Sequence, residues 1–346
     1  MALSVLVTGI GGVVGSRVAS RLVDDPAVSV LAGVDRHQRV LDRVTVHRAD
    51  LLADDLEPVF AGMDVVVHLA TTFSPSSAGE EVARADVALL RRVLDASSAA
   101  GVTRLVLVST AMVYGAWANN PTPLTEAAPL RPNPDFAYAV SRAEMERAAQ
   151  AWAEEVGATL VVLRPTTTVA GDASSWVADS LREVGRLAVG DEDPAVQYLH
   201  LDDLVEAVVL ATTTIAAGVY NVAPDESAPR SQIRRLSGAV PRARLTEDAA
   251  RRVVSFRRRA GLARTSPGIL PYTVHRWVVA NDRLRGSGWE PSYSNAEAYV
   301  EAHSARPWAM LNSKRRQQIA LGGLGAAAVT GAAAGAWVWR SMRRRR

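Results

Sequence analysis

A glycine-rich turn near the N-terminus constrains this chain more than any other feature. The stretch Thr8-Gly9-Ile10-Gly11-Gly12-Val13-Val14-Gly15 follows an apolar run and leads into helix-like sequence. Gly9 suits the tight turn, Gly12 lets the backbone approach a pyrophosphate, and Gly15 lets the helix pack closely on the strand. Free N–H groups and the helix dipole favour an anion at that helix N-terminus. The turn therefore predicts a strand and a helix that hold a dinucleotide.

An acidic residue at the expected distance strengthens this prediction. Asp35 ends a second apolar run, residues 28–34, about twenty residues after the last glycine of the turn. Its carboxylate can accept hydrogen bonds from both hydroxyls of an adenosine ribose, whereas a 2′-phosphate would meet its negative charge. The adjacent Arg36 would compensate for that repulsion only in part. We therefore expect NAD as the cofactor rather than NADP.

The composition argues against several other kinds of site. The chain of 346 residues has no cysteine, which excludes disulfides, thiolate metal sites and a cysteine nucleophile. Its six histidines form no close pair of the H-E-x-x-H kind, so we expect no metal. The pI of about 9.5 comes largely from residues 313–346, which hold eight cations and no acid. Basicity therefore belongs mainly to the C-terminal tail.

A second concentration of positive charge lies between residues 230 and 264, with eleven arginines against only Glu247 and Asp248. This stretch could face phosphate, an anionic substrate or a membrane surface, and a solvated helical face is an equally good interpretation. Aromatic residues do not interleave with the arginines in the manner of a platform for single-stranded nucleic acid. We therefore expect no nucleic-acid partner.

Apolar runs alternate with helical patterns over the first half of the chain. Strands separated by helices imply right-handed parallel crossovers, and continuously apolar strands such as Val65-Val66-Val67 are typical of a sheet covered on both faces. The sequence therefore predicts an α/β fold with a Rossmann-like, doubly wound parallel sheet. The expected strands are 3–8, 28–35, 43–48, 64–70, 104–109 and 159–163, and the expected helices are 14–23, 80–100 and 137–156.

The alternation loosens after about residue 170, which indicates a smaller lobe interwoven with the first. We assign residues 1–170 to a NAD-binding domain, to which 198–222 returns with one helix and one strand. Residues 171–197 and 223–312 form the expected substrate-binding lobe.

An uncharged stretch near the C-terminus, residues 319–339, lies between Lys314-Arg315-Arg316 and Arg340. As a helix, these twenty-one residues would extend ~31 Å, about the thickness of a hydrocarbon core. Their alanine and glycine content makes them only marginally hydrophobic. We expect a C-terminal transmembrane helix with a basic tail, 340–346, and the protein on the cytoplasmic face of the membrane; a flexible or peripheral tail is the alternative.

The expected chemistry lies at the carboxyl ends of the strands. Ser109 and Thr110 follow a strand, and Tyr138 begins a helix with Arg142 four residues later on the same helical face. A phenol beside a fixed cation is stabilised as phenolate, so it can exchange a proton with a substrate alcohol while a hydride moves to or from a nicotinamide. The hydroxyl of Thr110 would bond the same oxygen. We therefore predict Thr110, Tyr138 and Arg142 as catalytic residues.

Shorter motifs recur along the chain in a fixed order. Besides the glycine turn and Asp35 they are Ala49-Asp50-Leu51, Val67-His68-Leu69-Ala70, Val108-Ser109-Thr110-Ala111-Met112-Val113-Tyr114-Gly115, Tyr138 to Arg142, Leu163-Arg164-Pro165, His200-Leu201-Asp202-Asp203-Leu204, Gly218-Val219-Tyr220-Asn221-Val222 and Gly288-Trp289-Glu290-Pro291. Together they resemble the extended short-chain dehydrogenase/reductase family, in its branch of NAD-dependent epimerases and dehydratases. The resemblance covers about residues 3–303.

The resemblance implies roles for individual residues. Asp50 and Leu51 would contact the adenine, Leu69 and Ala70 would line the cofactor groove, and Thr110 and Tyr138 would be the catalytic pair. His68 is interpreted as a core histidine rather than an acid or base. The cofactor-binding residues predicted from the turn and the resemblance are Thr8, Gly9, Gly12, Gly15, Asp35, Asp50, Leu51, Leu69, Ala70, Tyr138 and Arg142.

Two residues depart from the family pattern. Arg142 stands where the family normally has a lysine, and a guanidinium is planar, longer and always protonated. Asp86 stands where the family usually has an asparagine, and its carboxylate cannot donate the amide hydrogen bond and adds negative charge near the cofactor. Reduced or specialised catalysis is therefore one hypothesis for this chain.

Two functions follow from these residues. The first is a NAD-dependent oxidoreductase, epimerase or dehydratase acting on a secondary alcohol or ketone, with a nucleotide-sugar or steroid-like substrate. The alternative is a catalytically weak or inactive NAD(P)-binding protein that regulates a partner at a membrane. A homodimer, and membrane association through residues 319–339, are compatible with both.

Overall fold

A computed structural model describes residues 2–73, 79–173, 175–190, 192–236 and 244–302. Its centre is a seven-stranded sheet in the order β11-β6-β5-β4-β1-β2-β3, and every neighbouring pair is parallel. The expected α/β fold with a doubly wound parallel sheet is confirmed. The strands of the sheet are β1 (Leu3–Thr8), β2 (Val28–Asp35), β3 (Thr45–Arg48), β4 (Val65–His68), β5 (Arg104–Val108), β6 (Thr159–Pro165) and β11 (Gly218–Val222).

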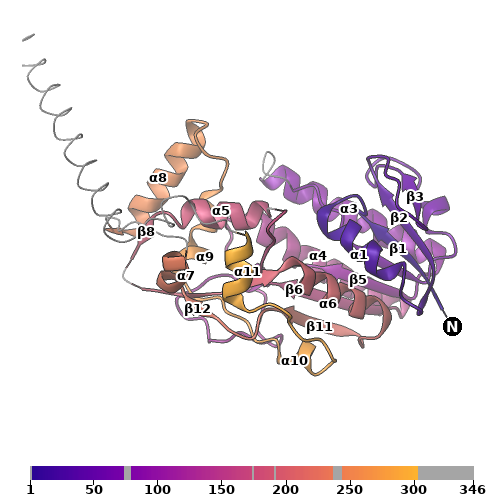
Figure 1. Cartoon of the computed structure of the whole chain (residues 1–346). Helices are drawn as coiled ribbons and strands as arrows, with labels where there is room; N and C mark the ends of the chain where they lie inside the picture. The colour runs from indigo at the N-terminus through magenta and orange to yellow at the C-terminus, as the bar shows by residue number, and fades with distance from the viewer. Residues whose placement is uncertain (1, 74–78, 174, 191, 237–243, 303–346) are drawn as a thin grey trace, which may run out of the picture.

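Helices cover both faces of the sheet, because the central strands have no polar face (Figure 1). One apolar core lies between the sheet and the buried sides of α1 and α6, and a second lies between the sheet and α2, α3 and α4. All four residues of β4 are buried, as its unbroken apolar sequence predicts. The covering helices are α1 (Val13–Leu22), α2 (Glu57–Phe60), α3 (Glu80–Ala100), α4 (Ala137–Val156) and α6 (Leu201–Thr213).

The strand order reverses between β1 and β4, where the chain turns from one half of the sheet to the other. In open α/β sheets, ligands bind beyond the carboxyl ends of the strands at such a switch point. Thr8 ends β1, His68 ends β4 and Val108 ends β5, so the predicted cofactor and catalytic segments all emerge at this edge.

Short elements, most of them from the later part of the chain, lie beside this edge. They enclose a third core, to which the single turn η1, residues of α5 and α8, and Tyr272 contribute. These elements are η1 (Ala111–Tyr114), β7 (Thr167–Val169), α5 (Trp176–Val184), β8 (Ala188–Val189), β9 (Ala195–Val196), β10 (Tyr198–His200), β12 (Ala228–Pro229), α7 (Arg230–Leu236), β13 (Arg244–Leu245), α8 (Glu247–Arg259), η2 (Pro267–Ile269), α9 (Pro271–Val274), α10 (Asp282–Arg285) and α11 (Asn295–Ala302).

Some expected boundaries are wrong by a few residues. The strand expected at 64–70 ends at His68, because the N–H groups of Leu69 and Ala70 turn towards the hydroxyl of Thr8. The expected transmembrane segment, 319–339, lies outside the described residues. Within the described ranges, no helix is long and apolar enough to cross a membrane. The division into two lobes stays a prediction.

Candidate functional site

The turn after β1 depends on glycine at two positions. Gly9 has a φ of +71°, and a Cβ there would lie 2.8 Å from the Cα of Ala70. A Cβ on Gly15 would lie 2.3 Å from the carbonyl oxygen of Gly9. Real Cβ atoms do not approach backbone this closely, so larger residues would push α1 and β4 away from β1. The spacing of these glycines therefore sets the shape of the turn.

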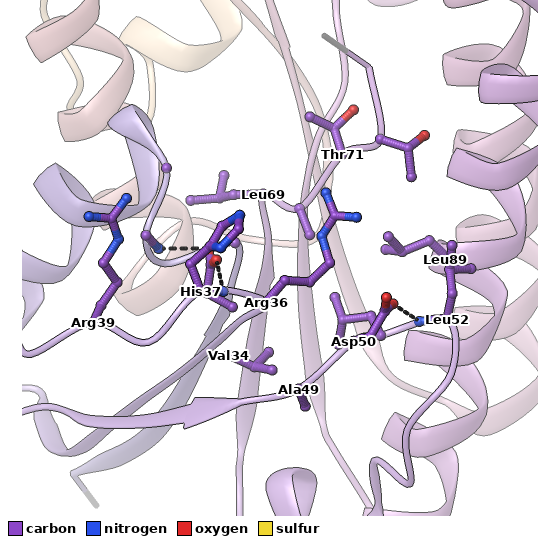
Figure 2. Close-up of a pocket in the computed structure, with 17 residues that line it drawn as sticks. Val34, Arg36, His37, Arg39, Ala49, Asp50, Leu52, Leu69, Thr71 and Leu89 are labelled. Atoms are coloured by element: carbon purple, nitrogen blue, oxygen red, sulfur yellow. Dashed lines mark hydrogen bonds between the residues drawn. The ribbon is translucent and has the colours of Figure 1, made fainter. Parts of the chain in front are cut away.

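A pocket of about 270 Å³ opens at the switch point, between the glycine turn and the ends of β2 and β4 (Figure 2). Seven of the predicted cofactor-binding residues line it: Gly9, Gly12, Asp35, Asp50, Leu51, Leu69 and Ala70. Its other lining residues were not predicted as cofactor-binding: Gly11, Val34, Arg36, His37, Arg39, Ala49, Leu52, Thr71, Thr72 and Leu89. A pocket lined by a glycine turn and by the acid at the end of the neighbouring strand fits the adenosine end of a dinucleotide.

Asp35 holds the two sides of this pocket together. Its Oδ2 accepts a hydrogen bond from the backbone N–H of Gly11 at 3.0 Å, and its Oδ1 accepts one from the N–H of His37 at 2.9 Å. Arg36 and Arg39 are exposed around the same pocket, and within the described ranges neither has a carboxylate partner (Figure 2). The sequence showed the acid and Arg36, but it did not show that Arg39 would join them.

Thr8 does not line the pocket, but it holds two residues that do. Its Oγ1 accepts hydrogen bonds from the N–H groups of Leu69 and Ala70, each at 3.3 Å, and lies 2.9 Å from Nδ1 of His68. Burial lowers the pKa of His68 to about 4, although Asp86 opposes the shift, so the ring is neutral near pH 7. Its Nε2 has no hydrogen-bond partner among the described residues.

Ser109 and Thr110 point into different surroundings at the end of β5. The hydroxyl of Ser109 bonds the carboxylate of Glu146 on α4, which also pairs with Arg164 at 2.6 Å. Thr110 caps η1, since its Oγ1 accepts a hydrogen bond from the N–H of Met112 at 3.2 Å. This bond uses a lone pair of Thr110, so its hydroxyl hydrogen can still be donated. Thr110 therefore fits the role predicted for it, whereas Ser109 is structural.

Tyr138 lies among aromatic rings at the start of α4. Its ring makes edge-to-face contacts with Phe73 at 5.1 Å and with Trp176 at 5.0 Å, measured between centroids. Phe73 and Trp176 stack on each other at 5.7 Å, and Phe136 lies 5.8 Å from Tyr138. The rings come from segments far apart in the chain, so no local sequence pattern indicated the cluster.

The expected proximity of Arg142 to Tyr138 is present. The guanidinium carbon of Arg142 lies 5.2 Å from the centroid of the Tyr138 ring, in a cation–π arrangement. Arg142 does not line the cofactor pocket. It is linked to that pocket through Thr71, whose Oγ1 accepts a hydrogen bond from Arg142 Nη2 at 2.9 Å.

The two departures from the family pattern contact each other. Nη2 of Arg142 lies 3.0 Å from Oδ2 of Asp86, and the two side chains are 7% and 0% exposed. Asp86 also accepts hydrogen bonds from Thr71 Oγ1 at 3.1 Å and from the N–H of Thr72 at 2.6 Å. The negative charge that Asp86 adds is therefore paired with the buried guanidinium of Arg142.

Burial is the largest single effect on Arg142 and would by itself lower its pKa, yet the pKa is raised because the interactions with Asp86 and Tyr138 together outweigh burial. Arg142 is therefore a permanent cation beside the phenol. Its Nε has no hydrogen-bond partner among the described residues, so one donor of the guanidinium is free. Among those same residues, no group of three or more potential ligand side chains could hold a metal ion.

Comparison with known proteins identifies the family. The model of the NAD dependent epimerase/dehydratase family matches residues 5–223. A 3-diazoavenalumate denitrifying reductase from Streptomyces sp is 32% identical over 84% of this chain and 97% of that protein. A UDP-glucose 4-epimerase from Streptomyces lividans is 32% identical over 60% of this chain and 70% of that protein.

Solved structures agree on the fold. The UDP-glucose 4-epimerase of Thermus thermophilus, determined in complex with NAD, superposes with a TM-score of 0.64 and 24% identity, over 87% of this chain and 97% of that one. The resemblance found from the sequence motifs is confirmed, and with it NAD as the cofactor and an enzyme of this type. The individual site residues stay predictions.

Proposed function

Because the chain belongs to the NAD-dependent epimerase/dehydratase family, we propose that it oxidises a secondary alcohol or reduces the corresponding ketone. One observation carries this proposal: the phenol of Tyr138 and the buried cation of Arg142 are in contact at the carboxyl edge of the sheet. The glycine turn would hold the pyrophosphate of NAD, and Asp35, Asp50 and Leu51 would surround its adenosine.

Bound NAD supplies the hydride acceptor or donor. Tyr138 gives a proton to the substrate oxygen, or takes one from it, and the guanidinium of Arg142 lies over the ring of this phenol. Thr110 donates its free hydroxyl hydrogen to the same oxygen and so orients it. The rings of Phe73 and Trp176 exclude water from the phenol.

The surroundings of Tyr138 favour a flat, apolar substrate such as a steroid-like ring. Phe73, Phe136 and Trp176 offer ring faces and edges beside the phenol, and aromatic pairs of this kind stabilise by about 0.5–1.5 kcal/mol each. A planar substrate can replace those ring contacts with its own. The Streptomyces relative that matches this chain over 97% of its own length is named a reductase, which is consistent with net redox chemistry.

A nucleotide-sugar is the second candidate substrate. The arginines between residues 230 and 264 would suit a diphosphate, and the Streptomyces lividans relative is named a UDP-glucose 4-epimerase. The two candidates separate in one assay, in which purified protein with NADH or NAD is offered planar ketones and alcohols in one panel and sugar nucleotides in another. Turnover confined to the sugar nucleotides would reject the apolar substrate.

The catalytic role is tested by Tyr138→Phe. We expect turnover to fall by about 10²- to 10⁴-fold, because general acid–base catalysis contributes that much. NADH binding should stay within about twofold, since the ring contacts are kept. Tyr220→Phe is the matched control, because that hydroxyl bonds the carbonyl of Ala216 in the loop before β11. Unchanged turnover in Tyr138→Phe would favour the alternative, a NAD-binding protein that regulates a partner.

We also propose that residues 319–339 attach the chain to the cytoplasmic face of a membrane. The support is the uncharged sequence between clusters of basic residues, which lies outside the described residues. Truncation after Asn312 should move the protein from the membrane pellet to the supernatant. An unchanged distribution would refute this attachment.

A further inference from the structure

Helix α8 carries arginines of two kinds. On its inner side, Ala250 and Val254 are buried in the third core. Arg251 pairs with Asp135 at 2.8 Å and Arg257 pairs with Glu183 at 3.1 Å. These two arginines therefore fix the helix to the rest of the lobe, and their charges are balanced within the protein.

On the opposite side of α8, the described residues provide no such partners. Arg252, Phe256 and Arg259 follow one another at spacings of four and three residues, so they share one helical face. Phe256 is 67% exposed, and Leu262, just beyond the end of the helix, is also 67% exposed. Within the described part of the chain, neither Arg252 nor Arg259 has a carboxylate partner. We call these four residues the outer face of α8.

The combination is more informative than either part alone. Single exposed apolar residues are ordinary, and an arginine-rich helix can simply be solvated. Here Phe256 stands between two arginines that have no carboxylate partner among the described residues, and Leu262 follows the second of them, so the same region offers apolar groups and uncompensated positive charge. Helices that lie in a membrane interface show this chemistry, because the cations attract anionic headgroups and the apolar side chains enter the acyl boundary.

We propose that the outer face of α8 docks on an anionic lipid surface. A nucleic acid would use the arginines but leave the apolar side chains without a role, since Phe256 is the single aromatic residue between positions 230 and 264. Helix α8 lies at the end of the molecule away from β1, β2 and β3, so a planar surface can reach it without meeting the sheet (Figure 1). The docking surface is separate from the cofactor pocket and does not depend on the proposed reaction.

The absence of cysteine makes a local test direct. The full chain carries Phe256→Cys or Leu262→Cys, labelled with an environment-sensitive fluorophore, and is mixed with vesicles of phosphatidylcholine alone or with phosphatidylglycerol. Val40→Cys is the control, because that side chain is 93% exposed and comes five residues after the end of β2. Strand β2 lies at the opposite end of the molecule from α8 (Figure 1). We expect a blue shift and quenching by brominated lipid at positions 256 and 262 on the anionic vesicles, and neither at position 40.

Charge variants test the role of the arginines. With the label at position 262, Arg252→Glu and Arg259→Glu should each weaken the lipid-dependent signal by about fivefold or more, since one basic residue contributes about that factor near a membrane. Arg147→Glu is the matched control, because Arg147 is exposed on α4. It should leave the signal unchanged.

Four results would overturn the proposal: an equal signal on phosphatidylcholine alone, an equal signal at position 40, an equal loss with Arg147→Glu, or a shift that needs no vesicles and grows with protein concentration. The last would indicate contact with a second copy of the chain. Because the label reports contact at α8 itself, its result stays separate from any attachment through residues 319–339.

Discussion

Replacing Asp86 by asparagine should destabilise the protein although the side chain keeps its size. Asp86 is fully buried and accepts hydrogen bonds from Thr71, Thr72 and Arg142 at 2.6 to 3.2 Å. Asn at this position cannot balance the charge of Arg142, whose side chain is only 7% exposed. The variant therefore leaves an unpaired cation inside the site.

Removing one partner of a buried ion pair costs about 3–5 kcal/mol, so we expect Asp86→Asn and Arg142→Met each to lower the free energy of unfolding by about 3 kcal/mol. The double variant removes both charges together, so it leaves no buried charge without a partner. The double variant should lower the free energy of unfolding by about 3 kcal/mol in total, which is about 3 kcal/mol less than the sum of the two single effects. This difference is the coupling energy, and it lies near the upper end of the values measured for contacting residues.

Urea unfolding of the four proteins, followed by fluorescence, gives this coupling energy. The control cycle uses Arg91 and Glu144, which join the same two helices at 3.1 Å but are 63% and 49% exposed. Exposed pairs are worth about 0–1 kcal/mol, so Arg91→Met and Glu144→Gln should change little. If the effects of Asp86→Asn and Arg142→Met simply add to within about 0.5 kcal/mol, the two charges do not act as a pair and the reasoning fails.

Other expectations concern the cofactor pocket. The pKa of His68 falls from 6.5 to about 4 on folding, so between these pH values the unfolded chain takes up a proton that the native protein does not. The free energy of unfolding should therefore drop by about 3 kcal/mol as the pH falls from 6.5 to 4. In urea titrations, His68→Gln should reduce this dependence on pH, whereas the control His47→Gln should leave it unchanged. Gly15→Ala should cost about 1–3 kcal/mol, because its Cβ would lie 2.3 Å from a carbonyl oxygen, whereas Gly79→Ala meets no atom within 4 Å and should be neutral in thermal unfolding. In fluorescence titrations, NADH should bind roughly tenfold more tightly than NADPH. Asp35→Ala should reverse that preference, because exposed arginines remain around the pocket. Equal affinities for NADH and NADPH in the unaltered protein would contradict the role of the carboxylate.

The parts of this protein that its sequence determined are those in which the deciding residues are close neighbours along the chain. The strand at residues 3–8 depends on an apolar run, and Gly15 is required by its close contact with the carbonyl oxygen of Gly9 in the same turn. Asp35 could be placed because the acid ends the next strand of the same unit. Family membership followed from the order of such local motifs.

The tertiary structure decided which distant residues meet. Arg142 and Asp86 looked like two independent departures in the sequence, yet the packing of α3 against α4 places them 3.0 Å apart as one neutral pair. Phe73, Tyr138 and Trp176 form one ring cluster from three separate segments. Periodicity reports which side of an element is buried, but the partner across an interface depends on how whole elements pack, and that is why these contacts could not be predicted.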